Sequence, residues 1–145
     1  MPIDGNYEPS AWDWVAKQVD QIESSGGTEG LELQGKPVVV VSMRGRRSGK
    51  VRKAALMRVE HDGRYAIVAS KGGDAHHPDW YHNLLADPHV TLQDGRLVLD
   101  MRAREVTGAE RDEWWERAVE AWPDYATYQR NTDRTIPVFV LEPTS

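Results

Sequence analysis

The chain has 145 residues, enough for one domain with its own core and too short for two ordinary domains. Charged residues make up 28%, the formal net charge is -5 and there is no cysteine, which excludes disulfides and thiolate metal sites. The N-terminus does not resemble a signal peptide, and the longest apolar stretch, residues 37–43, is far short of the roughly 20 residues that span a bilayer. We therefore expect one soluble domain, 1–145, in a reducing, cytoplasmic setting.

The first predicted element is an amphipathic helix over residues 10–25. Ser10 can cap it, and apolar residues recur at intervals of three or four from Trp12 to Ile22. Such a stripe docks most often on the protein's own core, and contact with a membrane surface or a partner is the alternative. A Gly-rich connector, 26–36, follows the helix.

A run of strands then predicts a barrel core over residues 37–143. Residues 38–43 are continuously apolar, which is typical of a strand buried on both faces. Five further strands are predicted, and Asp-Gly turns join them into two hairpins before the last one: 53–60, 65–70, 89–93, 97–106 and 136–143.

Helices are predicted between these strands. One short helix covers 77–88, and a capping box from Thr107 to Glu110 opens a longer one. The apolar face of the longer helix is formed at i, i+3, i+4 and i+7 by Trp115, Ala118, Val119 and Trp122. Because no βαβ alternation is visible, we predict an α+β fold, an antiparallel barrel with packed helices, rather than a doubly wound parallel sheet.

A basic turn stands out in this acidic chain, because six of the ten residues 44–53 are Arg or Lys and none is acidic. The turn is not a P-loop, since the glycine spacing is too short and Val51 replaces the hydroxyl residue. Gly45 and Gly49 can direct several backbone N–H groups into one concavity. The cations around it are Arg46, Arg47, Lys50 and Arg52. An anion cradle explains this charge better than the alternative, a solvated hairpin tip.

Two further stretches add to the candidate site. Lys71 and Gly72 follow a predicted strand and could bring a second cation and backbone to the same anion. The chain has six Trp and one Phe, so it favours aromatic residues with a polar group, which suit a wet, flat ligand pocket as well as a core. The five histidines have no metal-binding spacing and G-x-S-x-G is absent, so we predict neither a metal centre nor an α/β-hydrolase.

Three stretches, taken in order, resemble the deazaflavin-dependent nitroreductase family, actinobacterial flavin-reductase-like proteins that use coenzyme F420. They are "GRRSGKVRKAAL", "YAIVASKGGDAHHPDWYHNLLADPHVTLQ" and "ERDEWWERAVEAWPDYATYQRNTDRTIPVFVLEP". The resemblance covers residues 35–143. It implies a split antiparallel β-barrel related to the FMN-binding barrels, and a hydride transfer from reduced F420 to a quinone or nitroaromatic acceptor.

The resemblance also implies where the coenzyme binds. The basic turn would hold its phosphodiester and polyglutamate tail, with Arg47, Arg52 and Lys71 on the phosphate. Main-chain groups near Ala55 would hold the edge of the deazaflavin ring. The expected cofactor-binding residues are Arg46, Arg47, Ser48, Gly49, Lys50, Arg52, Ala54, Ala55, Leu56, Ala69, Ser70, Lys71, Gly72, Pro78 and Trp80.

On the substrate side of the ring, the resemblance implies that Ser70, Tyr125 and Tyr128 are the catalytic residues. Tyr125 or Ser70 would orient the acceptor oxygen and stabilise the charge that develops on it. The expected substrate-binding residues are Met57, Trp80, Trp122, Tyr125 and Tyr128. Where the family's prodrug-activating member has tyrosines this chain has Met57 and Trp122, and Arg47 replaces a phosphate-binding Lys, so nitroimidazole reduction stays open.

The sequence leaves two alternatives. A nucleic-acid binder is disfavoured, because the net charge is -5 and the cations gather in one turn rather than over a face. A barrel that carries or senses FMN or haem, or reduces a substrate with FMN, is the second alternative, although a lone flavin phosphate needs fewer cations. The expected partner is a small-molecule acceptor, and a homodimer is expected because split barrels of this type often pair.

Overall fold

The computed structural model describes residues 7, 13–33, 35–70 and 77–144. Its elements in chain order are α1 (Asp13–Ser24), β1 (Glu32–Leu33), β2 (Lys36–Arg44), β3 (Val51–Met57), β4 (Glu60–His61), β5 (Arg64–Val68), α2 (Asp79–Ala86), β6 (His89–Asp94), β7 (Leu97–Val106), α3 (Gly108–Ala121), α4 (Asp124–Arg130) and β8 (Val138–Pro143).

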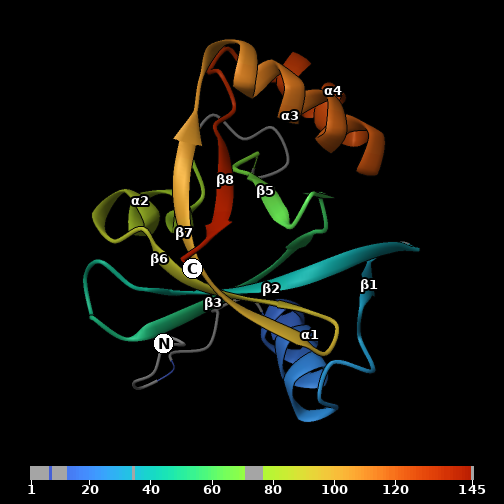
Figure 1. The fold of residues 1–145 in the computed structure, drawn as a ribbon, viewed down its shortest axis with the longest axis vertical. Coiled ribbons are helices and arrows are strands. Elements are labelled where there is room, and N and C mark those ends of the chain that lie inside the picture. Colours follow the sequence, from blue (N-terminus) through green and yellow to red (C-terminus); the bar gives the residue numbers. More distant parts are fainter. Residues whose placement is uncertain (1–6, 8–12, 34, 71–76, 145) are drawn as a thin grey trace.

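The strands form one sheet in the order β1-β2-β6-β7-β8-β5-β4 (Figure 1). The remaining strand, β3, lies outside this order and also pairs with β2. Every pairing between these strands is antiparallel. This confirms the predicted α+β class and the antiparallel barrel. Figure 1 places α3 and α4 together at one end of the molecule and α1 at the other end, where α1 packs beside β3.

The strands bury two apolar clusters because successive side chains point to opposite faces. On β2, Val39, Val41 and Met43 belong to the barrel cluster together with Phe139 and Leu141 of β8. The alternate β2 residues, Val38 and Val40, belong to the outer cluster, which α1, α3 and α4 cover. The prediction that this strand is buried on both faces is confirmed.

The predicted strand over 53–60 is interrupted. Arg58 N still donates to Pro37 O on β2 at 3.0 Å, whereas Val59 O accepts from Ala66 N on β5 at 2.8 Å. The chain therefore exchanges one partner strand for another at this corner, and β3 ends at Met57. Both partner strands are neighbours in the sequence, but the apolar pattern does not mark the residue at which the pairing changes from one to the other.

The first helix docks on the core, as the preferred interpretation predicted. Val19 and Ile22 are buried in the outer cluster, and the side chains of Lys17, Asp20 and Glu23 lie on the exposed face. Within the described part of the chain, no helix has the length and apolarity to cross a membrane. The predicted cap Ser10 lies outside the described residues.

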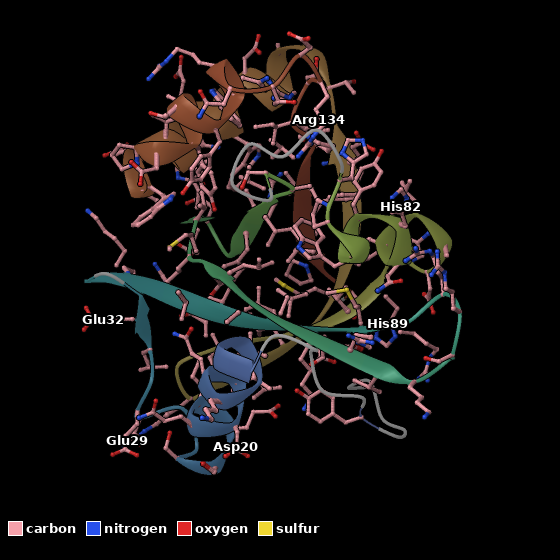
Figure 2. All side chains as sticks on the ribbon, turned by 180° about the vertical axis from the view of Figure 1, so that it is seen from behind. Asp20, Glu29, Glu32, His82, His89 and Arg134 are labelled. Atoms are coloured by element: carbon pink, nitrogen blue, oxygen red, sulfur yellow. The ribbon has the colours of Figure 1, made fainter. Side chains whose placement is uncertain are left out.

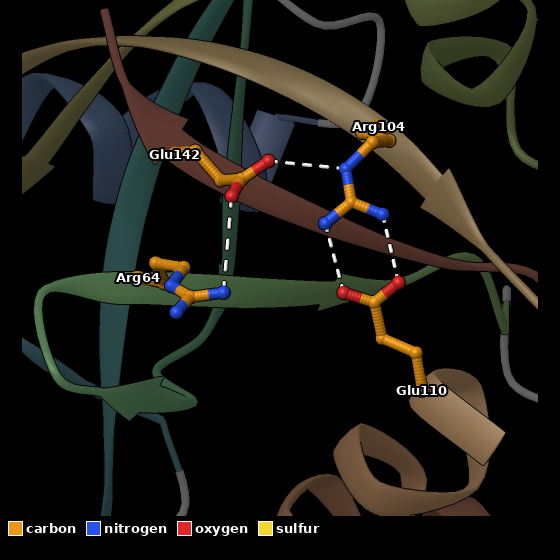
Figure 3. A network of polar contacts seen from close by, with 4 residues as sticks. All are labelled: Arg64, Arg104, Glu110 and Glu142. Atoms are coloured by element: carbon orange, nitrogen blue, oxygen red, sulfur yellow. Dashed lines mark hydrogen bonds and ion pairs between the residues drawn. The ribbon is translucent and has the colours of Figure 1, made fainter. Parts of the chain in front are cut away.

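The predicted capping box at the start of α3 is wrong. The Thr107 side chain makes no capping hydrogen bond. The Glu110 carboxylate instead forms a two-pronged pair with Arg104 on β7, at 2.8 Å for each bond (Figure 3). Arg104 Nε also donates to Glu142 at 3.0 Å, and Glu142 pairs with Arg64 at 3.8 Å. This surface network ties α3 to three strands.

The predicted apolar face of α3 is confirmed. Ala118 and Trp122 are buried in the outer cluster, and Trp115 and Val119 pack against it. Trp114, which the pattern did not single out, is 3% exposed and meets the His61 ring edge-on at 6.3 Å.

The barrel holds one buried tyrosine whose ionisation links pH to stability. The Tyr65 hydroxyl donates to Asp94 at 2.6 Å, and Arg58 binds both oxygens of the same carboxylate. Burial first, and the Asp94 bond second, raise the pKa of Tyr65 from 10.0 to about 12. The Tyr65 contribution is therefore fully present below pH 10.0 and is lost as the pH rises through about 12.

We expect the free energy of unfolding to fall more steeply between pH 10.0 and about 12 in the wild type than in Tyr65→Phe. Denaturant titrations at several pH values measure both slopes. Lysines ionise in the same pH range, but they are identical in the two proteins and so do not affect the difference between the slopes. Identical slopes would contradict the prediction.

Candidate functional site

The basic loop, Arg44–Lys50, is a closed turn of the β2–β3 hairpin. Gly45 N donates to Lys50 O at 2.8 Å and Gly49 N donates to Gly45 O at 2.9 Å, with Gly49 at a φ of 72°. Among the described residues, the exposed side chains of Arg47 and Lys50 form no hydrogen bond or ion pair. Their charges remain available to an external anion, as the cradle hypothesis requires.

Gly45 lets the loop fold back on Arg52. A Cβ at Gly45 would lie 3.2 Å from Arg52 Cγ and 3.3 Å from Lys50 O, which is tighter than ordinary contact. The half-buried Arg52 therefore crosses directly over the glycine. The loop brings Arg52 to the side of the predicted cations Arg46 and Arg47.

A buried asparagine on α2 anchors this loop, and sequence reasoning missed it. Asn83 Oδ1 accepts from Arg46 N at 3.1 Å and from Arg46 Nη1 at 3.0 Å, and Asn83 is 6% exposed. One signal was present in the sequence: Asn83 lies between Trp80 and Leu84 on the helix face where an apolar residue is expected.

The second predicted loop is described only at its ends. Lys71 and Gly72 lie outside the described residues. Ala69 and Ser70 are buried at the end of β5, and Pro78 is buried immediately before α2.

Within the described residues, one edge of β3 is open beyond Val51. The bonds from Gly45 N to Lys50 O and from Arg58 N to Pro37 O lie at the two ends of the β2–β3 ladder. Bonded pairs alternate in an antiparallel ladder, so Arg52, Ala54 and Leu56 bond to β2. The N–H and C=O groups of Lys53, Ala55 and Met57 therefore point the other way.

We call these main-chain groups of Lys53, Ala55 and Met57 the open edge. Among the described residues, only Tyr7 pairs along this side of β3, through an isolated bridge to Val51. Of the three residues predicted to hold a ring edge by their main chain, Ala55 has main-chain groups that pair with no described strand, whereas those of Ala54 and Leu56 are engaged with β2. The side chains of Ala54 and Leu56 pack instead on the barrel cluster.

Four predicted substrate residues share one apolar cluster, which includes the last residue of β3. Met57, Trp122, Tyr125 and Tyr128 all belong to or pack on the outer cluster, and we call them the aromatic cluster. The Tyr125 and Tyr128 rings meet edge-on at 6.1 Å. Trp80 is not among them: it packs on the barrel cluster, 6.1 Å from the Phe139 ring.

Tyr125 has the environment of a neutral hydrogen-bond donor. The residue is 6% exposed, and burial first, then the Tyr128 charge, raise the pKa of Tyr125 well above its ordinary value. The phenol is thus protonated at neutral pH. Its hydroxyl has no hydrogen-bond partner among the described residues, so it is available to a ligand oxygen.

A cavity of about 290 Å³, which was not predicted, lies on the face of β3 that carries the side chains of Val51 and Lys53. Lys53 borders it, pairs with Glu23 of α1 at 2.5 Å and lies 4.7 Å from the centre of the Tyr7 ring. The lining residues are Tyr7, Glu23, Val40, Ser42, Val51, Lys53, Thr91, Gln93 and Val98.

Solved structures place this geometry among known proteins. A structure described as an F420-H2 dependent reductase (FDR-A) is 57% identical with a TM-score of 0.70, and the match covers 73% of this chain and 94% of that one. A structure described as a domain-swapped dimer is 52% identical with a TM-score of 0.73, covering 92% of this chain and 100% of that one. A haem storage protein from Vibrio cholerae, 13% identical with a TM-score of 0.57, shares the fold alone. The split-barrel prediction is confirmed.

Sequence comparison agrees. The F420H(2)-dependent quinone reductase Rv1261c of Mycobacterium tuberculosis is 35% identical over 108 residues, which cover 72% of each chain. The sequence model of the F420H(2)-dependent quinone reductase family matches residues 14–143. The chain therefore belongs to the F420H(2)-dependent quinone reductase family, an F420-dependent oxidoreductase family as its sequence predicted.

Proposed function

We propose that this F420-dependent oxidoreductase binds its coenzyme along β3, with the anionic tail at the basic loop and the ring between the open edge and the aromatic cluster. The observation that carries the proposal is the position of β3. The strand begins directly after Lys50 and ends at Met57 of the aromatic cluster. Its seven residues span about 20 Å, which suits an elongated ligand with one charged end.

The described residues fit such a coenzyme. Arg47 and Lys50 offer unpaired charge to phosphate and carboxylate groups, and the N–H and C=O groups of Lys53 and Ala55 alternate as the donors and acceptors that a ring edge needs. When bound, reduced F420 supplies a hydride. The basic loop fixes the anionic tail, and β3 fixes the plane in which an acceptor can lie.

Tyr125 would complete the reaction on the acceptor side. The buried, protonated phenol would donate a hydrogen bond to the acceptor oxygen and stabilise the negative charge that develops there. Tyr128 and Trp122 would form the wall against which a flat acceptor packs. Ser70, which is 7% exposed, remains the second candidate for contact with the acceptor.

We expect Tyr125→Phe to lower kcat with menadione roughly 10- to 100-fold, because one donor to the developing oxyanion is lost. The Kd for F420 should stay within about twofold, since the ring is retained. The substitution removes no hydrogen bond within the described structure, so its melting temperature should match the wild type. Steady-state kinetics, a fluorescence titration and a thermal melt measure the three quantities.

The matched variant is Tyr128→Phe, which removes the same atom from the neighbouring, half-buried ring. We expect a smaller kcat loss there. Equal kcat in Tyr125→Phe and the wild type would remove Tyr125 from the proposed mechanism.

The acceptor that we propose is a quinone, with nitroaromatics as adventitious substrates. Met57 and Trp122 shape the aromatic cluster, so parallel turnover of menadione and a nitroimidazole under anaerobic conditions tests both classes. Preferential turnover of the nitroimidazole would contradict this order. FMN or haem as the resident group has no structural observation in its favour, because likeness to the haem storage protein is limited to the fold.

A second copy of this chain is the partner that we propose. The support is the 52% identical relative described as a domain-swapped dimer, together with the exposed apolar side chains of Leu97 and Val98. Light scattering during gel filtration should give twice the monomer mass. A cytoplasmic setting is also part of the proposal, supported by the absence of cysteine.

A further inference from the structure

Arg134, in the segment between α4 and β8, contacts three groups of the described residues at the junction of β5 and α2. Its Nη2 donates to Ser70 O at 2.7 Å, and its Nη1 donates to Ala69 O at 3.1 Å. The same Nη1 lies 3.0 Å from His77 Nδ1. The guanidinium thus joins the two ends of residues 71–76, the segment that contains the predicted Lys71 and Gly72. Figure 2 shows Arg134 at the end of the molecule that carries α3 and α4.

The backbone of Arg134 is itself held by α4. Gln129 Nε2 donates to Arg134 O at 2.8 Å, and Gln129 Oε1 accepts from Ile136 N at 3.0 Å. One amide side chain therefore fixes both ends of the short segment that presents the guanidinium. Gln129 follows Tyr128 directly in α4. Arg134 consequently connects the helix of the aromatic cluster with Ser70 and His77.

The three acceptors match a guanidinium better than any other side chain. A planar fork of N–H donors can span two adjacent carbonyls and a ring nitrogen at once, whereas an ammonium is a single point. His77 Nδ1 can accept only while the ring is neutral, and burial first, then the Arg134 charge, lower the pKa of His77. Stacking on Tyr81, with ring centres 4.2 Å apart, holds the ring in place.

We propose that Arg134 is a positioning residue for hydride transfer: it holds Ser70 and His77 at a fixed place relative to α4, and thereby sets Ser70 against the acceptor. The proposal rests on the proposed function, because Ser70 matters only if the coenzyme and acceptor bind beside it. In this proposal Arg134 contacts neither the coenzyme nor the acceptor. Its effect passes through the two carbonyls and the imidazole.

The first test compares Arg134→Gln with Arg130→Gln, an exposed α4 arginine whose guanidinium contacts Thr127 Oγ1 at 3.1 Å. We expect Arg134→Gln to lower kcat per coenzyme-binding site roughly 10- to 100-fold, because small misplacements of reacting groups are costly in rate. Arg130→Gln should retain wild-type kcat. A merely structural role would reduce the number of sites that bind F420 and leave kcat per site unchanged, and that result would overturn the proposal.

Arg134→Lys keeps the charge and is the milder change if the Gln variant does not fold. We expect its kcat per site to stay well below that of the wild type, since an ammonium cannot bridge Ala69, Ser70 and His77 together. Wild-type kcat in Arg134→Lys would show that the positive charge alone is sufficient. It would contradict the proposal that the planar guanidinium is required. Added guanidinium, far below denaturing concentrations, should restore part of the activity of Arg134→Gln and none of Arg134→Lys.

Amide hydrogen exchange without coenzyme separates this inference from the proposed function. In Arg134→Gln, peptides that cover the end of β5 and the start of α2 should exchange faster, while those from the β6–β7 hairpin stay unchanged. Failure of the wild type to bind F420 would contradict the proposed function. Amide hydrogen exchange would still show whether Arg134 holds the junction of β5 and α2. Unchanged exchange at Ser70 and His77 would overturn the inference even in an enzyme that turns over normally.

Discussion

The double variant Arg47→Gln/Lys50→Gln should bind F420 roughly 30-fold more weakly than the wild type. Each exposed cation that meets a phosphate or carboxylate contributes about 1 kcal/mol, and 2 kcal/mol corresponds to roughly that factor. Neither side chain has a partner among the described residues, so the folded protein loses no internal contact. The Kd from fluorescence titration should also depend less steeply on salt in the variant than in the wild type.

The matched control is Lys36→Gln/Arg96→Gln, which changes the net charge by the same amount. Lys36 begins β2 and Arg96 lies in the β6–β7 turn, so both are exposed and at the opposite end of the strands from the basic loop. We expect its Kd to stay within about twofold of the wild type. Equal weakening in the two double variants would mean that net charge, rather than the basic loop, attracts the coenzyme.

Gly27→Ala should destabilise the fold by about 3 kcal/mol or more. A Cβ at Gly27 would lie 1.8 Å from Gly95 O and 2.3 Å from Gly95 C, both rigid backbone atoms, so α1 could not dock against the β6–β7 hairpin. The φ of 86° adds the strain of a left-handed conformation. In a domain of this size the melting temperature should fall by roughly 10 °C.

Gly26→Ala separates that clash from the backbone strain. Gly26 also has a positive φ, 68°, but a Cβ there meets no atom within 4 Å. We expect only the strain, about 1 kcal/mol, and a melting temperature roughly 3 °C below the wild type. Similar melting temperatures for the two variants would contradict the close contact between the Gly27 and Gly95 backbones.

Much of the fold was predictable, because it follows from local pattern. The continuous apolar run of β2, the two Asp-Gly hairpins and the apolar face of α3 all appear in the structure. The corner at Arg58 and Val59 was not predictable, since no turn residue or break in the apolar pattern marks where the pairing changes from β2 to β5. The capping box is absent because the Glu110 carboxylate pairs with Arg104 instead of reaching back to the helix end.

The candidate site was predictable as a set of residue types and less so as a geometry. The basic loop directly precedes β3 and Met57 ends it, and Met57 shares the outer cluster with Trp122, Tyr125 and Tyr128, whereas Trp80 packs on the barrel cluster. The residues that hold the site were missed, because Asn83 meets Arg46 across 37 positions and Arg134 meets Ser70 across 64. A polar residue whose partner is that far along the chain leaves no local pattern. The open edge was likewise visible only from the register of β3 on β2.

Parallel fluorescence titrations of the purified protein with oxidised F420 and with FMN, followed by turnover of reduced F420 with menadione, test whether the coenzyme binds along β3. We expect a Kd for F420 on the order of micromolar, FMN binding at least about tenfold weaker, and turnover of the quinone. Tight binding of FMN without binding of F420 would leave the basic loop as an anion site. It would contradict both the placement of the coenzyme along β3 and the hydride transfer proposed here.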